Sequence, residues 1–153
     1  MNPEAIDPNR SPFQLILTAR RWMAAAAQLY WGAAPPQSAR ILVVDDDPSL
    51  LSLLRILLAT SGFQVTVARD GSEALNLTAT NQYDLILLDL EMPGVNGRTF
   101  FHRFRAEGKS TPVVVISAYG AEGANREIGA QGFVAKPFEP EALVRTVERL
   151  LTR

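Results

Sequence analysis

The sequence contains no cysteine among its 153 residues. This absence excludes a disulfide framework, a thiolate metal site and a cysteine nucleophile. An excess of charge of either sign is also missing, because 15 Lys and Arg residues are matched by 16 Asp and Glu residues. A nearly neutral chain has no global field that favours nucleic acid or an anionic membrane. We therefore expect no direct nucleic-acid partner, and any charged chemistry must come from local clusters.

Signals for membrane insertion and for export are missing as well. The stretch 13–31 is apolar, but Arg20 and Arg21 lie near its middle. Each would cost about 2.5–3.5 kcal/mol at the centre of a membrane helix. The acids Glu4 and Asp7 precede this stretch, and no small-residue cleavage site closes it, which is untypical of a secretory signal. The sequence thus predicts a cytoplasmic protein with no transmembrane span.

The N-terminal region 1–39 differs in composition from the rest of the chain. Residues 1–12 hold three prolines among polar side chains, a composition typical of a mobile lead. Residues 13–31 lack proline and glycine, and their narrow polar stripe predicts a helix that is otherwise apolar. Such a helix needs a partner: the following domain, a second copy in a homodimer, or another protein. Residues 32–39 read as a stiff proline-containing linker, so one domain is expected at 40–153.

From residue 40 onward, short apolar runs alternate with helix-length segments. The runs are rich in leucine and β-branched residues and mostly lack polar alternation, as in parallel strands covered on both faces. Five repeats of strand then helix predict a single doubly wound α/β domain with right-handed crossovers. The expected strands are 41–44, 63–68, 84–88, 112–116 and 132–135, and the expected helices are 48–60, 71–80, 97–107, 121–130 and 139–151.

The first of these helices carries clear signals at both ends. Asp47 precedes Pro48, so an N-cap acid comes before a proline at the first helical position. Gly62 follows Ser61 and is well placed to end the helix. Local chemistry therefore agrees with the boundaries that the apolar pattern indicates.

Polar side chains of several kinds lie at the ends of four predicted strands. In open parallel sheets the functional residues gather beyond the carboxyl ends of the strands, where the strand order reverses. If the first and third strands are neighbours about 4.8 Å apart, these side chains form one site. They are Asp45, Asp46 and Asp47 after the first strand, Asp89 after the third, Ser117 after the fourth, and Lys136 with Pro137 after the fifth.

Such a cluster suits a divalent cation and a phosphoryl group. Two carboxylates about 4 Å apart repel by roughly 4 kcal/mol at an effective dielectric constant near 20, so a proton or a cation must enter. Mg²⁺ takes oxygen ligands and is commonly held by one or two carboxylates together with a phosphate. The ammonium of Lys136 and the hydroxyl of Ser117 can contact phosphoryl oxygens. We therefore infer phosphoryl transfer onto Asp89, assisted by position and charge neutralisation.

Four short motifs follow one another along the chain: Ile-Leu-Val-Val-Asp-Asp-Asp-Pro at 41–48, Asp-Leu-Glu-Met-Pro-Gly at 89–94, Ser-Ala at 117–118 and Lys-Pro-Phe at 136–138. These motifs resemble those of response regulator receiver domains, the CheY-like family. They occur in the family's order, and the resemblance covers about residues 40–153. It implies the flavodoxin-like strand order 2-1-3-4-5.

The resemblance also implies a role for each site residue. Asp89 would be the phosphoacceptor, Lys136 would pair with the phosphoryl group, and the Lys136-Pro137 peptide would be cis, as in many relatives. Mg²⁺ would be bound by Asp46 directly, by Asp45 through water, by Asp89 and by the backbone carbonyl of Glu91. Ser117 and Phe133 would act as the switch, with Ser117 moving toward the phosphoryl group and Phe133 into the vacated space.

By the same resemblance, the partners would be a histidine kinase or a histidine phosphotransfer protein, and a downstream protein target. Phe133 could instead be plain core, as aromatic residues at strand starts often are. The glycine-rich segment between Ser117 and Lys136 is shorter than the family leads us to expect, which predicts a short fourth helix.

Three other functions compete with a phosphorylation switch that is not an enzyme in the usual sense. The chain could be an intermediate in a phosphorelay, passing the group on to another histidine. It could be a Mg²⁺-dependent phosphatase of the haloacid dehalogenase type, whose second acid Glu91 partly imitates. It could also be a scaffold whose predicted helix at 13–31 mediates dimerisation or docking to a membrane surface.

Overall fold

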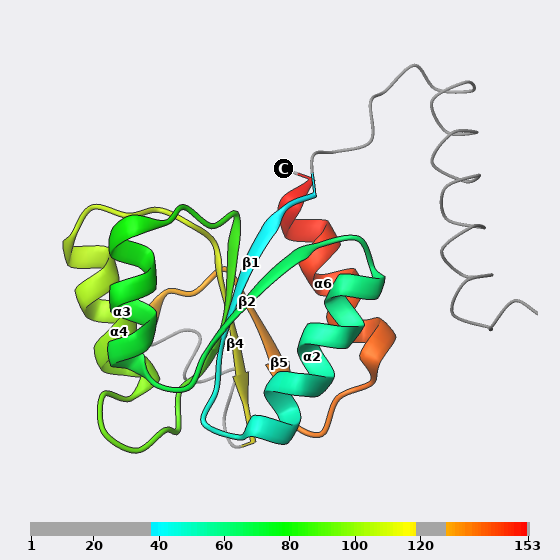
Figure 1. The fold of residues 1–153 in the computed structure, drawn as a ribbon, viewed down its shortest axis with the longest axis horizontal. Helices are drawn as coiled ribbons and strands as arrows, with labels where there is room; N and C mark the ends of the chain where they lie inside the picture. The colour runs from blue at the N-terminus through cyan, green and yellow to red at the C-terminus, as the bar shows by residue number, and fades with distance from the viewer. Residues whose placement is uncertain (1–37, 119–127, 153) are drawn as a thin grey trace, which may run out of the picture. The chain divides into compact units, whose positions relative to one another are not determined.

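A computed structural model of the chain describes residues 38–118 and 128–152. Five parallel strands form one sheet in the order β2-β1-β3-β4-β5. Figure 1 follows the alternation of these strands with helices along the chain. The elements are β1 Arg40–Val44, α2 Pro48–Thr60, β2 Gln64–Ala68, α3 Gly71–Thr80, β3 Leu85–Asp89, α4 Gly97–Ala106, β4 Val113–Ser117, β5 Gly132–Ala135 and α6 Pro140–Leu151.

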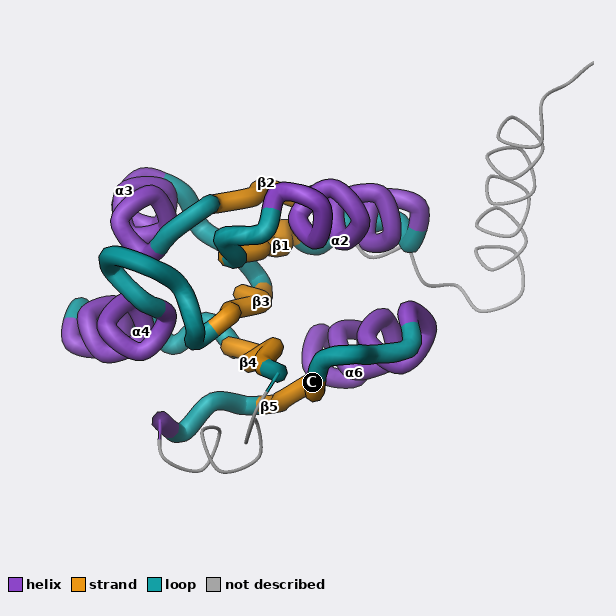
Figure 2. Tube along the Cα trace, turned by 90° about the horizontal axis from the view of Figure 1, so that it is seen from below, coloured by secondary structure: helices purple, strands orange, loops and turns teal. Residues whose placement is uncertain are grey.

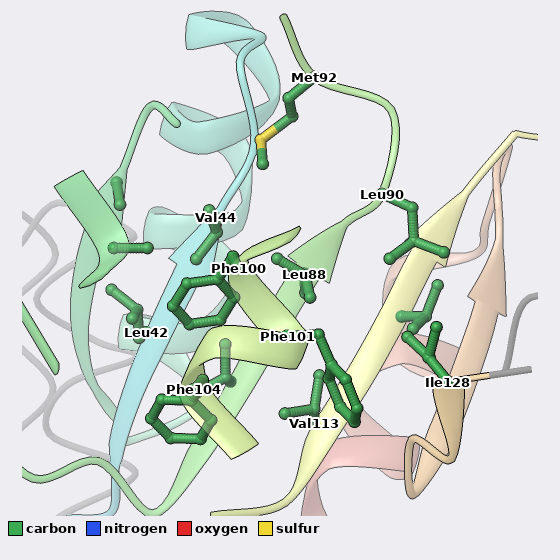
Figure 3. Packing of buried hydrophobic residues seen from close by; sticks show 14 of the residues in the cluster. Leu42, Val44, Leu88, Leu90, Met92, Phe100, Phe101, Phe104, Val113 and Ile128 are labelled. Carbon is green, nitrogen blue, oxygen red and sulfur yellow. The ribbon is translucent and has the colours of Figure 1, made fainter. Parts of the chain in front are cut away.

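The helices form two layers. Viewed along the sheet in Figure 2, α3 and α4 cover one face, and α2 and α6 cover the other. Each layer buries its own apolar cluster: one joins Phe100 and Phe104 of α4 to β1, β3 and β4, and the other joins Leu54 of α2 and Val147 of α6 to the opposite face. Figure 3 shows the phenylalanines of α4 packed over the strands, where the rings of Phe100 and Phe104 stack with centroids 5.5 Å apart.

The predicted doubly wound sheet and its strand order are confirmed. Helices α2 and α3 and strand β5 have the expected bounds. Strands β3 and β4 each begin and end one residue later than predicted, and β1, β2, α4 and α6 differ by one residue at one end. The second strand begins after Phe63 because the N–H groups of Gly62 and Phe63 donate to the carbonyls of Ala59 and Leu58, with Gly62 at φ 95°. These bonds complete the end of α2 before the strand starts.

Two expectations fall largely on residues that the structure does not describe. The predicted lead and helix at 1–31 lie outside the described residues, as does most of the linker at 32–39. The predicted helix at 121–130 overlaps the described part of the chain in its last three positions alone. The division of the chain near residue 39 therefore stays a prediction. Within the described residues, no helix is long and apolar enough to span a bilayer.

Candidate functional site

The register of the sheet brings the predicted site residues to one edge. Val44 of β1 pairs with Leu88 of β3, so the next residues, Asp45 and Asp89, lie at neighbouring strand ends. Asp89 pairs with Ile116 of β4, whose next residue is Ser117. Ser117 in turn pairs with Ala135 of β5, and Lys136 follows. Side chains up to 91 positions apart in the sequence therefore meet, as in the ion pair between Asp45 and Lys136.

Three carboxylates converge at this edge. Asp45 and Asp89 are almost fully buried, with 2% and 5% of their surface exposed, whereas Asp46 is exposed. One carboxylate oxygen from each of the three lies within 4.8 Å of the others. An all-oxygen set of this size fits a hard divalent cation such as Mg²⁺. The predicted acidic cluster is thus present, and it offers both buried and solvent-facing ligands.

Asp47 lies beside the cluster and has a different task. Its Oδ1 accepts from the N–H groups of Ser49 at 2.8 Å and Leu50 at 3.3 Å, so it caps α2 as predicted. Its own N–H donates to Oδ1 of Asp45 at 2.8 Å. The start of α2 therefore orients the Asp45 carboxylate, because the cap fixes the peptide that donates to it.

Lys136 bridges the two buried carboxylates. Its Nζ lies 2.8 Å from Oδ2 of Asp45 and 3.3 Å from Oδ2 of Asp89, and 24% of its side chain is exposed. Burial acts to lower the pKa of Lys136, but hydrogen bonds and charge attraction from Asp45 and then Asp89 outweigh it and raise the pKa. Lys136 is therefore held in its charged form. The peptide bond between Lys136 and Pro137 is cis, as the resemblance implied.

The surroundings of the Asp89 carboxylate disfavour its charged form. Burial raises its pKa above the ordinary value, and the charge of Asp45 adds to the rise. The N–H of Glu91, which donates to Oδ1 of Asp89 at 3.1 Å, and the charge of Lys136 oppose it without cancelling it. The ionised form is thus disfavoured in the absence of a cation, and a bound divalent ion would relieve this cost.

The two predicted switch residues lie in different environments. Ser117 is the last residue of β4 and is buried, with 2% of its surface exposed. It directly follows Ile116, which pairs with Asp89. Phe133 of β5 is 40% exposed, so the alternative reading of this residue as plain core is wrong. The structure presents one arrangement of Ser117 and Phe133, and their switching roles stay predictions.

The loop 90–96 after β3 rests on two glycines that sequence reasoning missed. The N–H of Gly97 donates to the carbonyl of Leu90 at 3.3 Å, and the N–H of Gly71 donates to the carbonyl of Val95 at 2.9 Å. A Cβ atom on Gly97 would lie 2.0 Å from the carbonyl oxygen of Asp89. The sequence offered one signal for these contacts: each of the two helices begins with a glycine. Glycine is unfavourable in a helix, so its presence at these positions indicates another requirement, such as a close backbone contact.

Comparison with known proteins identifies several relatives of the domain. A family model described as the response regulator receiver domain matches residues 41–148. The DNA-binding response regulator MtrA of Mycolicibacterium smegmatis is 43% identical over 117 residues, which cover 74% of this chain and 51% of MtrA. The chain spans about half the length of the first curated relatives it matches.

Solved structures resemble the domain in fold and in sequence. The receiver domain of the Francisella response regulator 1452 has a TM-score of 0.72 and 33% identity, covering 76% of this chain and 98% of that one. The response regulator TrrA of Thermotoga maritima, in complex with Mg²⁺-BeF, has a TM-score of 0.67 and 34% identity, covering 73% and 98%.

One expectation is overturned by these relatives. The absence of a direct nucleic-acid partner was inferred from the nearly neutral charge, yet MtrA is named a DNA-binding response regulator. The inference was wrong because net charge limits the long-range field and not the charge of a local surface.

Proposed function

Because the chain belongs to the family of response regulator receiver domains, we propose that it accepts a phosphoryl group on Asp89 from a histidine kinase or a histidine phosphotransfer protein. The observation that carries the proposal is the meeting of three carboxylates with Lys136 at the carboxyl edge of the sheet. A buried acceptor with a raised pKa, beside a paired lysine, is typical of a functional site.

We propose that the acidic cluster binds Mg²⁺ through Asp46, through Asp45 by way of water, through Asp89 and through the carbonyl of Glu91. The oxygen ligands fit this ion, and the complex of TrrA with Mg²⁺-BeF supports the assignment. The ion would supply positive charge to the phosphoryl oxygens. Asp45 and Asp46 hold it, and the peptide of Asp47 fixes the Asp45 carboxylate from behind.

In the transfer itself, a carboxylate oxygen of Asp89 forms a bond to phosphorus. The bond between phosphorus and the donor histidine nitrogen breaks, and the electron pair stays on that nitrogen. Lys136, already within 3.3 Å of Asp89, neutralises a phosphoryl oxygen. Ser117 would donate a hydrogen bond to another oxygen, and Phe133 would change its exposure as the surface adjusts.

We propose a cytoplasmic location and an output through a changed surface presented to a downstream protein. The 43% identity to MtrA supports a second candidate output, the control of DNA binding. A phosphorelay role would be marked by transfer from Asp89 back to a phosphohistidine. Turnover of small phosphate esters would instead indicate the phosphatase alternative.

The experiment is phosphorylation of the full chain by a small phosphodonor, with and without Mg²⁺, followed by intact mass spectrometry. The wild type should gain one phosphoryl group in a Mg²⁺-dependent manner, and Asp89→Asn should not. Asp84→Asn is the matched control, because Asp84 is an exposed carboxylate before the start of β3 whose side chain accepts from the N–H of Arg40. No phosphoryl gain by a folded wild type, or an equal gain by Asp89→Asn, would refute the proposal.

A further inference from the structure

Helix α3 contributes no side chain to the acidic site, yet its first residue contacts the loop 90–96 that follows Asp89. The N–H of Gly71 donates to the carbonyl oxygen of Val95 at 2.9 Å. The first N–H groups of a helix have no partner inside the helix, so α3 offers a donor that the loop carbonyl can use. Two residues 24 positions apart in the chain (95 − 71 = 24) are joined here through their backbones.

This contact leaves no room for a side chain at position 71. A Cβ atom on Gly71 would lie 2.4 Å from the carbonyl oxygen of Val95 and 2.7 Å from its Cγ1. Real Cβ atoms essentially never approach another heavy atom within 3.0 Å. Most of the obstruction is backbone, which cannot rotate away as a flexible side chain would. A larger residue at position 71 must therefore move either the helix or the loop.

The start of α3 is fixed by two side-chain hydrogen bonds. Oδ1 of Asp70 accepts from the N–H of Glu73 at 2.8 Å, and Oε2 of Glu73 accepts from the N–H of Arg69 at 2.8 Å. This reciprocal pair of side-chain bonds fixes the turn that carries Gly71. The displacement caused by a Cβ atom would thus fall on Val95 and its loop.

The same loop carries the residues that surround the acceptor. Its first residue, Leu90, is buried and linked to Gly97. The N–H of Glu91 donates to Oδ1 of Asp89 at 3.1 Å. Met92 is also buried, so Glu91 lies between two buried residues, and Pro93 and Gly94 separate Met92 from Val95.

We propose that Gly71 is a positioning residue for the phosphorylation site: its contact with Val95 holds the loop 90–96 where Glu91 can serve the acceptor and the metal. The inference rests on the proposed function, because it concerns the Mg²⁺ ligand and the acceptor named there. Gly71 acts through Val95 and contacts no reacting atom.

The test compares wild type with Gly71→Ala in a Mg²⁺ titration followed by ¹H–¹⁵N NMR, together with the initial rate of phosphorylation by a small phosphodonor. Residues that orient metal ligands from behind typically change metal affinity by 10- to 100-fold. We expect the dissociation constant for Mg²⁺ to rise by about 10-fold or more and the phosphorylation rate to fall with it. In the metal-free protein, the amide signals of Asp89 and Glu91 should already shift.

Val147→Ala is the control for a general loss of stability. Val147 is fully buried in α6, in the apolar cluster on the opposite face of the sheet from α3. The urea midpoint of the Val147→Ala variant should fall, while its Mg²⁺ affinity and phosphorylation rate should stay at the wild-type values. Equal losses in both variants, or wild-type affinity in Gly71→Ala, would overturn the inference. If the wild type itself binds no Mg²⁺ and gains no phosphoryl group, the proposed function fails instead.

A second variant keeps the inference testable if Gly71→Ala does not fold. Asp70→Ala removes the acceptor for the N–H of Glu73 and adds no atom at the contact. It loosens the turn that holds Gly71 and should weaken Mg²⁺ binding by about fivefold. Unchanged affinity in a folded Asp70→Ala would also refute the positioning role.

Discussion

Replacement of Gly97 by alanine sets two opposing effects against each other. Alanine is favoured over glycine in a helix by about 1 kcal/mol, and Gly97 is the first residue of α4. A Cβ atom there, however, would lie 2.0 Å from the carbonyl oxygen of Asp89 and 2.8 Å from Cα of Leu90. Real Cβ atoms essentially never lie closer than 3.0 Å to such an atom. The new Cβ and the Asp89 carbonyl oxygen must therefore move apart by 3.0 − 2.0 = 1.0 Å.

The steric effect should win, because the obstructing atoms are backbone atoms of Asp89, the last residue of the central strand β3, and of Leu90, which follows it. Overpacking of this kind costs about 1–3 kcal/mol or more, which exceeds the gain in helix propensity. We expect Gly97→Ala to lower the free energy of unfolding by about 2 kcal/mol. A displacement of about 1 Å at a reacting group can slow a reaction by about 100-fold, so phosphorylation of Asp89 should slow far more than the loss of stability explains.

Urea denaturation followed by far-UV circular dichroism measures the first effect, and intact mass spectrometry with a small phosphodonor measures the second. Both tryptophans belong to the segment 1–37, so circular dichroism is the more direct reporter of the domain. Gly108→Ala is the control: Gly108 has φ 76° and no atom within 4 Å of a built Cβ. It should lose about 1 kcal/mol through backbone strain and keep the wild-type phosphorylation rate. A Gly97→Ala protein as stable and as reactive as wild type would refute the reasoning.

Substitutions at three residues, Asp89, Lys136 and Asp47, test the electrostatics and the capping of the site. Asp89→Asn should raise the stability of the metal-free protein at neutral pH, because the folded pKa of Asp89 lies above its unfolded value. The folded state then binds more protons than the unfolded state, so the wild type loses stability relative to Asp89→Asn as pH rises through the folded pKa. Urea midpoints of the two proteins, measured across pH without Mg²⁺, test this. A difference between the two midpoints that does not change with pH would contradict it. Lys136→Met should lower the free energy of unfolding by about 2 kcal/mol, because Asp45 and Asp89 lose their ion-pair partner. The loss should be smaller than for a fully buried ion pair, because Lys136 is partly exposed. Adding Asp89→Asn to it should restore part of the loss, and a double variant less stable than Lys136→Met would contradict the assignment. Asp47→Ala should lower the free energy of unfolding by about 1 kcal/mol through loss of the α2 cap, and Asp47→Asn should lower it by less than half of that. Equal thermal midpoints for the two variants would contradict the capping role.

The sequence alone determined the features that depend on near neighbours in the chain. The bounds of α2 follow from Asp47, Pro48 and Gly62, each acting within a few residues of the helix ends. The alternation of apolar runs and helical periods predicted the parallel sheet, because both faces of such a sheet must be apolar. The strand order came from family resemblance, since local patterns contain no signal for which strands are neighbours.

The tertiary structure alone decided what depends on register and burial. The pairing of Val44 with Leu88 sets Asp45 beside Asp89, and the resulting burial raises the pKa of Asp89. The exposure of Phe133 likewise depends on which elements cover β5. The contact between Gly71 and Val95 joins the start of α3 to the loop 90–96, which no local pattern connects. Such features arise when distant segments pack together. Close packing leaves no space for an added atom at Gly71, and the exclusion of water raises the pKa of Asp89.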